Sequence, residues 1–224
     1  MIQGKDRGSA PAQHGASRGP VGPQRRGLVV ATGVEGGQRL LQIIIQGRGG
    51  QGAQTAGSLL ATVFFAEGRE VQSFASYGGA RRGTPVSSFI RVDDRPVRLR
   101  CDIEQADAIL CFDSSLLEGR LLATAGPATL IVTNSSRTPQ QWAEQLPGRR
   151  VIPVDALAIS RRHGLARIVN SALLGALARA IGAPRLDVLT RVLTEEAPKL
   201  HDENIAACED GYACVDAQMQ GALA

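Results

Sequence analysis

The chain has few of the residues that hold metals and clusters. It contains three histidines and four cysteines (Cys101, Cys111, Cys208 and Cys214), and no two cysteines form a C-x-x-C pair. A zinc or iron–sulfur site built by this chain alone is therefore not expected. Four thiols in 224 residues without a secretory leader favour the reducing cytoplasm. We interpret the cysteines as small buried side chains.

Long apolar runs and an excess of charge in the body are also missing. No stretch approaches the ~18 consecutive apolar residues of a membrane helix, so no membrane partner is expected. The formal net charge is +4, but residues 1–33 carry five basic side chains and one acidic one. The remaining 20 basic and 20 acidic residues balance. The body therefore lacks the basic footprint of a nucleic-acid-binding protein.

The N-terminal region differs in composition from the rest. "MIQGKDRGSAPAQHGASRGPVGPQRRG" is rich in Gly, Pro, Arg and Ser and nearly free of large apolar side chains. We therefore predict a disordered extension over residues 1–38 and one domain over residues 39–224. A transit peptide is disfavoured because glycine and proline oppose an amphipathic helix, and a translation start near Val34 is the alternative.

From residue 40 onward, short β-rich runs alternate with helical ones. The predicted strands are 40–46, 69–75, 106–113, 128–134 and 149–155, with a two-stranded hairpin over 85–100 that turns at Asp93-Asp94. Helices are predicted over 53–66, over 114–125, after each later strand and from 170 to the C-terminus. This pattern predicts an α/β fold, Rossmann- or flavodoxin-like, with a mainly parallel but mixed sheet flanked by helices and a helical C-terminal segment.

A glycine-rich turn joins the first strand to the first helix. "QGRGGQG" (46–52) satisfies G-x-G-x-x-G, the arrangement that lets backbone amides at a helix start approach a phosphate. A dinucleotide site also needs an acidic residue near the end of the second strand, and "VQSFASYG" (71–78) has none. A free-standing NAD-dependent reductase is therefore disfavoured.

A second loop, "SYGGARRGTP" (76–85), is expected at the same carboxyl edge of the sheet. Arg48, Arg81 and Arg82 are then placed to converge with the helix N-terminus on one polyanion. The alternative is that these arginines are solvated or pair with acids of a partner protein.

Several motifs occur in one order. "GRGGQGAQTAGSLLA", "VQSFASYGGARRGTPVSSFIRVDDRPVRLR", "ADAILCFDSSLL", "NSALLGALARAIGA" and "EEAPKLHDENIAACEDGY" resemble the gamma subunit of 2-oxoacid:ferredoxin oxidoreductases, the pyruvate and ketoisovalerate enzymes above all. The resemblance runs from about residue 41 to residue 215.

The resemblance implies a role within a complex. That family converts a 2-oxoacid and coenzyme A to acyl-CoA, CO2 and reduced ferredoxin. Thiamine diphosphate and Mg2+ are expected on alpha and beta subunits, and [4Fe-4S] clusters on beta and delta subunits. The gamma subunit is expected to help hold coenzyme A and close the active site, with no catalytic residue or metal of its own.

The site residues carried over from the resemblance lie in three segments. They are Gly47, Arg48, Gly49, Gly50, Gln51 and Gly52 in the first turn, Tyr77, Gly78, Arg81, Arg82 and Gly83 in the second loop, and Asn170 at the start of a late helix. The family often has Pro-Glu between the Tyr-Gly and the arginines, which this chain lacks. There are two alternatives: a purely structural assembly subunit, and the related subunit of an indolepyruvate or aryl 2-oxoacid enzyme.

Isolated polar residues have simpler interpretations. Asp113 follows a strand at the carboxyl edge and is expected to cap the next helix more than to act as an acid. Asp102 is expected in a turn or at a partner chain. His163 is expected to close a helix, where a cation is favoured, and His201 to lie on the surface.

Overall fold

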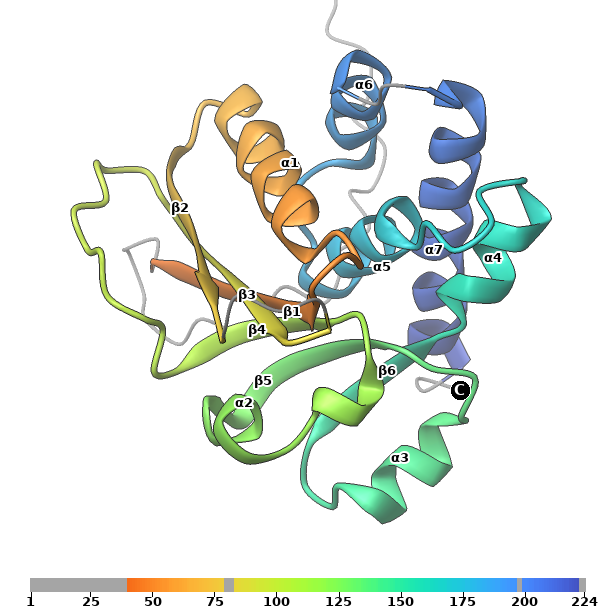
Figure 1. Ribbon diagram of the computed structural model, residues 1–224, viewed down its shortest axis with the longest axis horizontal. Coiled ribbons are helices and arrows are strands. Elements are labelled where there is room, and N and C mark those ends of the chain that lie inside the picture. Colours follow the sequence, from red (N-terminus) through yellow and green to blue (C-terminus); the bar gives the residue numbers. More distant parts are fainter. Residues whose placement is uncertain (1–39, 79–82, 197–198, 222–224) are drawn as a thin grey trace, which may run out of the picture.

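The computed structural model describes residues 40–78, 83–196 and 199–221, so the predicted extension 1–38 and both Arg81 and Arg82 lie outside the described residues. Its centre is a six-stranded sheet in the order β2-β3-β1-β4-β5-β6 (Figure 1). The strands are β1 (Leu41–Arg48), β2 (Glu70–Tyr77), β3 (Pro85–Asp93), β4 (Ala106–Cys111), β5 (Ala125–Asn134) and β6 (Arg150–Val154). The predicted α/β class with a mixed, mainly parallel sheet is confirmed.

The antiparallel part of the sheet differs from the prediction. β3 is one strand that pairs antiparallel with both β1 and β2, and β1, β4, β5 and β6 are parallel neighbours. The predicted hairpin over 85–100 is therefore wrong. Both edges of β3 are already occupied along its length, so residues 95–100 have no edge on which to pair, and Pro96 lacks an amide hydrogen. The hairpin that exists joins β2 to β3.

Helices cover the sheet on two sides (Figure 1). They are α1 (Ala53–Ala66), the 3-10 helix η1 (Ser114–Leu116), α2 (Gly119–Ala123), α3 (Pro139–Gln145), α4 (Ala156–Arg162), α5 (Asn170–Ile181), α6 (Leu186–Glu196) and α7 (His201–Gly221). Residues of α1 and α5 share one core with β1, and residues of η1, α2 and α3 share a second core on the opposite face. The predicted helix over 114–125 is thus two short helices.

β1 is the centre of both cores because its side chains alternate between them. Ile43 and Ile45 pack with α1 and α5, and Ile44 packs with the η1 and α2 side. All three isoleucines are essentially inaccessible to solvent. Leu60, Val63 and Phe64 form the buried face of α1 as predicted, and Leu59 is partly buried.

The strand directions decide which loops meet. β2 and β1 are both antiparallel to β3, so they point the same way and end at the same edge of the sheet, where β3 begins. Arg48 is opposite Pro85 and Tyr77 is opposite Val86 in the register. The glycine turn and the β2–β3 loop therefore leave the sheet side by side, as predicted.

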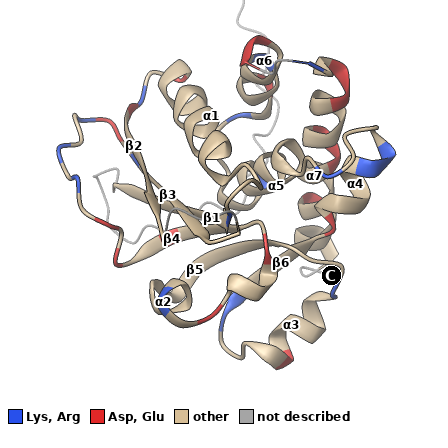
Figure 2. Ribbon diagram, in the orientation of Figure 1, with Lys and Arg blue, Asp and Glu red and all other residues tan. Residues whose placement is uncertain are grey.

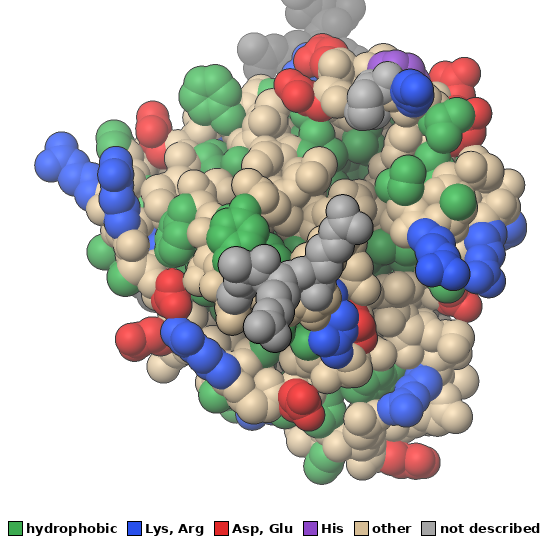
Figure 3. All heavy atoms as spheres, in the orientation of Figure 1, with side chains coloured by type: hydrophobic (Ala, Val, Ile, Leu, Met, Phe, Trp, Pro, Cys, Tyr) green, Lys and Arg blue, Asp and Glu red, His purple; other side chains and the backbone are tan. Residues whose placement is uncertain are grey.

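Charged residues are spread over the molecule. Figure 2 shows acidic residues along α7 and basic residues at α4 and in the loop after β3. On the face drawn in Figure 3, basic and acidic side chains are interspersed. No helix within the described ranges is long and apolar enough to cross a membrane.

Candidate functional site

The glycine turn opens α1 without a capping side chain. Gly50 and Gly52 have φ angles of 93° and 89°, a region that favours glycine, and Gly52 is the N-cap of α1. The first turn of α1 contains no acidic residue. Gln51 closes the turn, because its side-chain Oε1 accepts from the backbone amide of Arg48 at 2.6 Å and its backbone amide donates to the Arg48 carbonyl at 2.9 Å. The positive end of the helix dipole is therefore left uncompensated by side chains at this turn.

Asn170 lies against this turn. It is the first residue of α5, and its Nδ2 donates to the Gly52 carbonyl at 3.2 Å. A Cβ at Gly52 would lie 2.6 Å from that nitrogen. The fold therefore brings together two predicted site residues that are 118 positions apart.

The described part of the second loop is bound to the first. The Gly49 amide donates to the Thr84 carbonyl at 2.9 Å, and the Gly78 amide donates to the Pro85 carbonyl at 2.9 Å. The Tyr77 hydroxyl donates to Gln54 Oε1 on α1. Tyr77, Gly78 and Gly83 are thus at the predicted edge.

Arg48 makes contacts that its predicted role did not include. Its Nε donates to Asp113 Oδ2 at 2.7 Å, its NH2 to Ser115 Oγ at 2.9 Å and its NH1 to the Gly83 carbonyl at 3.3 Å. The guanidinium therefore joins the end of β1, the β2–β3 loop and the turn after β4. Its charge is largely balanced by Asp113, so Arg48 is not a free anion receptor.

Asp113 is the N-cap of η1, as predicted. Its carboxylate accepts from the Ser115 amide at 3.1 Å and from the Ser115 hydroxyl at 2.6 Å. Partial burial alone would raise the pKa of Asp113, but hydrogen bonds from Ser115 and Arg48 and the nearby guanidinium charge outweigh it, so the pKa is lowered. The pairing with Arg48 was missed because no local sequence pattern links residues 65 apart.

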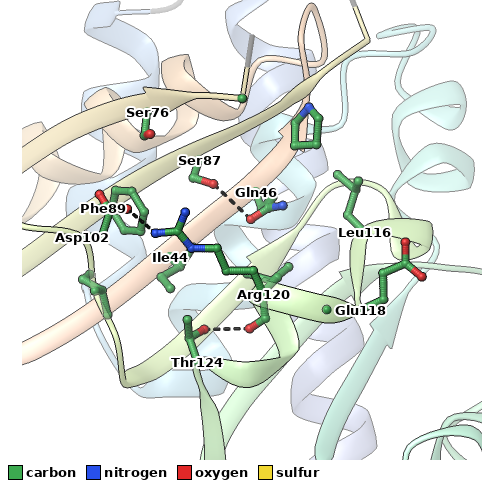
Figure 4. A pocket seen from close by; sticks show the side chains of 15 residues that line it. Ile44, Gln46, Ser76, Ser87, Phe89, Asp102, Leu116, Glu118, Arg120 and Thr124 are labelled. Carbon is green, nitrogen blue, oxygen red and sulfur yellow. Dashed lines mark hydrogen bonds and ion pairs between the residues drawn. The ribbon is translucent and has the colours of Figure 1, made fainter.

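A cavity of about 400 Å³ opens on the sheet face opposite α1 (Figure 4). Its floor includes Ile44 and Phe89, and Gly78 and Pro85 place it beside the β2–β3 loop. Arg120 extends from α2 and donates from NH2 to Asp102 Oδ2 at 2.7 Å. Asp102 was predicted to lie in a turn or at a partner chain, and this internal pair was not anticipated.

The remaining titratable groups do not form a reaction centre in the described part of the chain. No group of three or more metal-binding side chains is found there. Burial raises the pKa of the Cys111 and Cys208 thiols to about 12. The interpretation of the cysteines as buried side chains is confirmed for these two, but it is wrong for Cys101, which is exposed, and Cys214 is only partly buried. His163 follows α4 and contacts Asp210 at 2.8 Å, and His201 is exposed as predicted.

Comparison with known proteins decides the family. The family model described as pyruvate ferredoxin/flavodoxin oxidoreductase matches residues 42–214. The chain belongs to this family. The resemblance predicted from the motifs is confirmed.

Relatives and a solved structure define the branch of the family. The chain is 35% identical over 179 residues to the common subunit gamma of pyruvate/ketoisovalerate oxidoreductases from Thermococcus kodakarensis, covering 77% of this chain and 96% of the relative. It is 31% identical to pyruvate synthase subunit PorC of Methanocaldococcus jannaschii, with the same coverage. The crystal structure of pyruvate oxidoreductase subunit PORC from Thermotoga maritima has a TM-score of 0.70 and 27% identity, covering 79% of this chain and 97% of that one. The chain is accordingly a gamma-type oxidoreductase subunit.

Proposed function

We propose that this chain is the gamma subunit of a thiamine diphosphate-dependent 2-oxoacid:ferredoxin oxidoreductase and that it positions coenzyme A for attack on an intermediate held by neighbouring subunits. Thiamine diphosphate, Mg2+ and [4Fe-4S] clusters belong to those alpha, beta and delta-type partners, and ferredoxin or a similar acceptor takes the electrons. The relatives named as a common gamma subunit support the assignment to a complex. The chain contributes orientation and no bond-making group.

One observation carries the role in binding coenzyme A. The uncapped N-terminus of α1 lies at the sheet edge where β2 ends, and the Gly49–Thr84 hydrogen bond holds the two loops together. Free amide hydrogens at a helix start favour an anion, and coenzyme A carries a pyrophosphate and a ribose phosphate. The phosphates are proposed to sit at 47–52 and 77–83, with Asn170 supporting the first turn.

Arg48 acts in this proposal mainly by holding the loops. Its three contacts fix Gly83 and the turn at Asp113 relative to the glycine turn. Arg81 and Arg82, which lie outside the described residues, are proposed to provide positive charge that Asp113 does not balance.

Steady-state kinetics of the complete complex test this proposal. Arg48→Ala and Arg81→Ala are expected to raise the KM for coenzyme A about tenfold, while thiamine diphosphate and cluster contents stay unchanged. Arg48→Ala does so by releasing the loops that hold the phosphates, and Arg81→Ala by removing one charge-assisted contact. Arg69→Ala is the matched control, since Arg69 pairs with Asp94 at 2.8 Å beside the start of β2, at the opposite end of that strand. An unchanged KM in both test variants would refute the role in binding coenzyme A.

The engagement of Arg48 within the chain favours one alternative, a purely structural subunit. In that case the two loops face a partner protein, and the arginine variants lose subunits on purification while the complex that remains binds coenzyme A normally. Quantifying subunit stoichiometry alongside the KM separates the two functions. The choice among pyruvate, ketoisovalerate and aryl 2-oxoacids such as indolepyruvate is assigned to the partner subunits.

A further inference from the structure

The lining of the pocket beside the β2–β3 loop is polar at the edge of the sheet and apolar further inside. In the strand register Gln46 is opposite Ser87, and Ser87 is opposite Ser76, so an amide and two hydroxyls form one row across three strands. The next row toward the interior is apolar, with Ile44 opposite Phe89. Ser87 Oγ donates to Gln46 Oε1 at 3.0 Å, which fixes the polar row. The pocket therefore has hydrogen-bonding groups at the edge of the sheet and an apolar floor behind them.

The other wall carries charges of both signs. Arg120 reaches across the pocket to Asp102 in Figure 4, and Glu118 lies at the other end of the lining. The side chain of Arg120 is 86% exposed and its guanidinium is paired with Asp102, so it lies on the solvent side of the pocket. Two carboxylates against one guanidinium make the interior unfavourable for a phosphate. Carboxylates do accept hydrogen bonds from a neutral amine, and a guanidinium stacks on an aromatic ring.

We propose that this pocket holds the adenine ring of the coenzyme A whose phosphates bind the adjacent loops, an inference that rests on the proposed function. The flat ring lies on Ile44 and Phe89 under the Arg120 guanidinium. Its ring nitrogens accept from the Ser76 hydroxyl or the Gln46 side-chain amide, because the Ser87 hydroxyl already donates to Gln46 Oε1. Its exocyclic amine donates to a carboxylate of Asp102 or Glu118. A cavity of about 400 Å³ is large enough for the base and part of the ribose.

The pocket lies next to the loop proposed to contact the phosphates of coenzyme A, as an adenine site must. Gly78 and Pro85 line it and also flank the loop proposed to contact the phosphates. With the base held inside this chain, the pantetheine arm extends away from it toward the partner subunits. The chain thus anchors one end of the carrier and leaves the thiol end free for the reaction.

Two substitutions on the edge strand give a matched test. Ser76→Leu fills part of the pocket, whereas Ser73→Leu adds the same side chain to an exposed position of β2 on the opposite face of the sheet. The purified complex is assayed for the KM of coenzyme A and for the inhibition constants of adenosine 3′,5′-bisphosphate and inorganic pyrophosphate. Ser76→Leu should raise both the KM of coenzyme A and the inhibition constant of adenosine 3′,5′-bisphosphate about tenfold, the usual effect of losing a stacked base. It should leave the inhibition constant of pyrophosphate unchanged. Ser73→Leu should change none.

Arg120→Ala gives a second measurement that does not depend on filling the pocket. Because Arg120 is exposed, its loss leaves the fold intact and should raise the inhibition constant of adenosine 3′,5′-bisphosphate about fivefold. Failure of this compound to inhibit the wild-type complex, or unchanged constants in both Ser76→Leu and Arg120→Ala, would overturn the adenine site. If Arg48→Ala still raises the KM for coenzyme A in that case, the proposed function stands and only the pocket assignment falls. If no variant changes the KM, both fall.

Discussion

Arg48 and Asp113 are 65 residues apart and form an ion pair of 2.7 Å at the edge of the sheet. The pair connects the turn after β1 to the turn after β4, and the contact of Arg48 with the Gly83 carbonyl adds the β2–β3 loop. One side chain thus fixes three segments that are expected to act together. The geometry depends on the planar guanidinium, because three different nitrogens make the three contacts.

The first prediction concerns this geometry. Arg48→Lys keeps the charge but cannot donate in three fixed directions, so it should destabilise the chain nearly as much as Arg48→Ala does. The pair is partly exposed, and the expected loss is about 1 kcal/mol, or roughly 2–4 °C in Tm for a domain of this size. Thermal unfolding followed by circular dichroism measures it. A lysine variant with the wild-type Tm would show that charge alone is sufficient.

The second prediction concerns the pH dependence of this contribution. The pKa of Asp113 is lower in the folded chain than in the unfolded chain, so the folded state binds fewer protons there. The stabilisation is therefore complete above the ordinary aspartate pKa of about 3.9 and disappears as the pH falls through the lowered folded value. The difference in unfolding free energy between wild type and Asp113→Asn should be constant near neutrality and shrink below about pH 4. Urea titrations at a series of pH values give this difference, and a gap that persists in acid would contradict the prediction.

The sequence was sufficient for elements whose signals are local. The apolar run of β1, the glycines after it and the helical spacing of α1 lie within one continuous segment. The helix was predicted at its observed bounds, whereas the strand predicted over 40–46 is Leu41–Arg48 and so includes Gly47 and Arg48, which had been assigned to the turn. The segment 95–100 was misread because Val97 and Leu99 alternate with polar residues as they would in a strand. Strand pairing needs a free neighbouring edge, and β3 has none. That information is absent from the segment itself.

In the candidate site, too, local features could be predicted from the sequence and contacts between distant segments could not. The glycine turn was recognisable from spacing, and the contact of Asn170 with Gly52 connects residues that only the fold brings together. Asp113 was predicted as a cap because the serines follow it directly, but its pairing with Arg48 depends on the order of β1 and β4 in the sheet. Resemblance to a family named Asn170 as a site residue, and the structure adds the contact that it makes.

The third prediction tests the fit between Gly52 and Asn170. Gly52→Ala introduces a Cβ at a φ of 89° and 2.6 Å from Asn170 Nδ2, so it should cost about 1–3 kcal/mol of stability. Adding Asn170→Ala removes the collision but leaves the backbone strain. The double variant should therefore recover part of the loss relative to the sum of the single changes, as a double-mutant cycle would reveal. Simple additivity would mean that the two residues are not in contact.

The fourth prediction concerns the packing of α5 against α7, which supports Asn170 from behind the site. A Cβ at Gly211 would lie 2.0 Å from the Ala172 carbonyl oxygen, and backbone cannot move aside as a flexible side chain does. Gly211→Ala should therefore separate the two helices and destabilise the chain by about 3 kcal/mol, the upper part of the range for overpacked cores. Gly221→Ala on the same helix is the control, since no atom of another described segment lies within 4 Å of its added Cβ, and its stability should change by less than about 0.5 kcal/mol. Equal denaturation midpoints for the two variants would show that α5 and α7 do not approach each other so closely. In that case hydrogen exchange at the start of α5 in Gly211→Ala would remain as slow as in wild type.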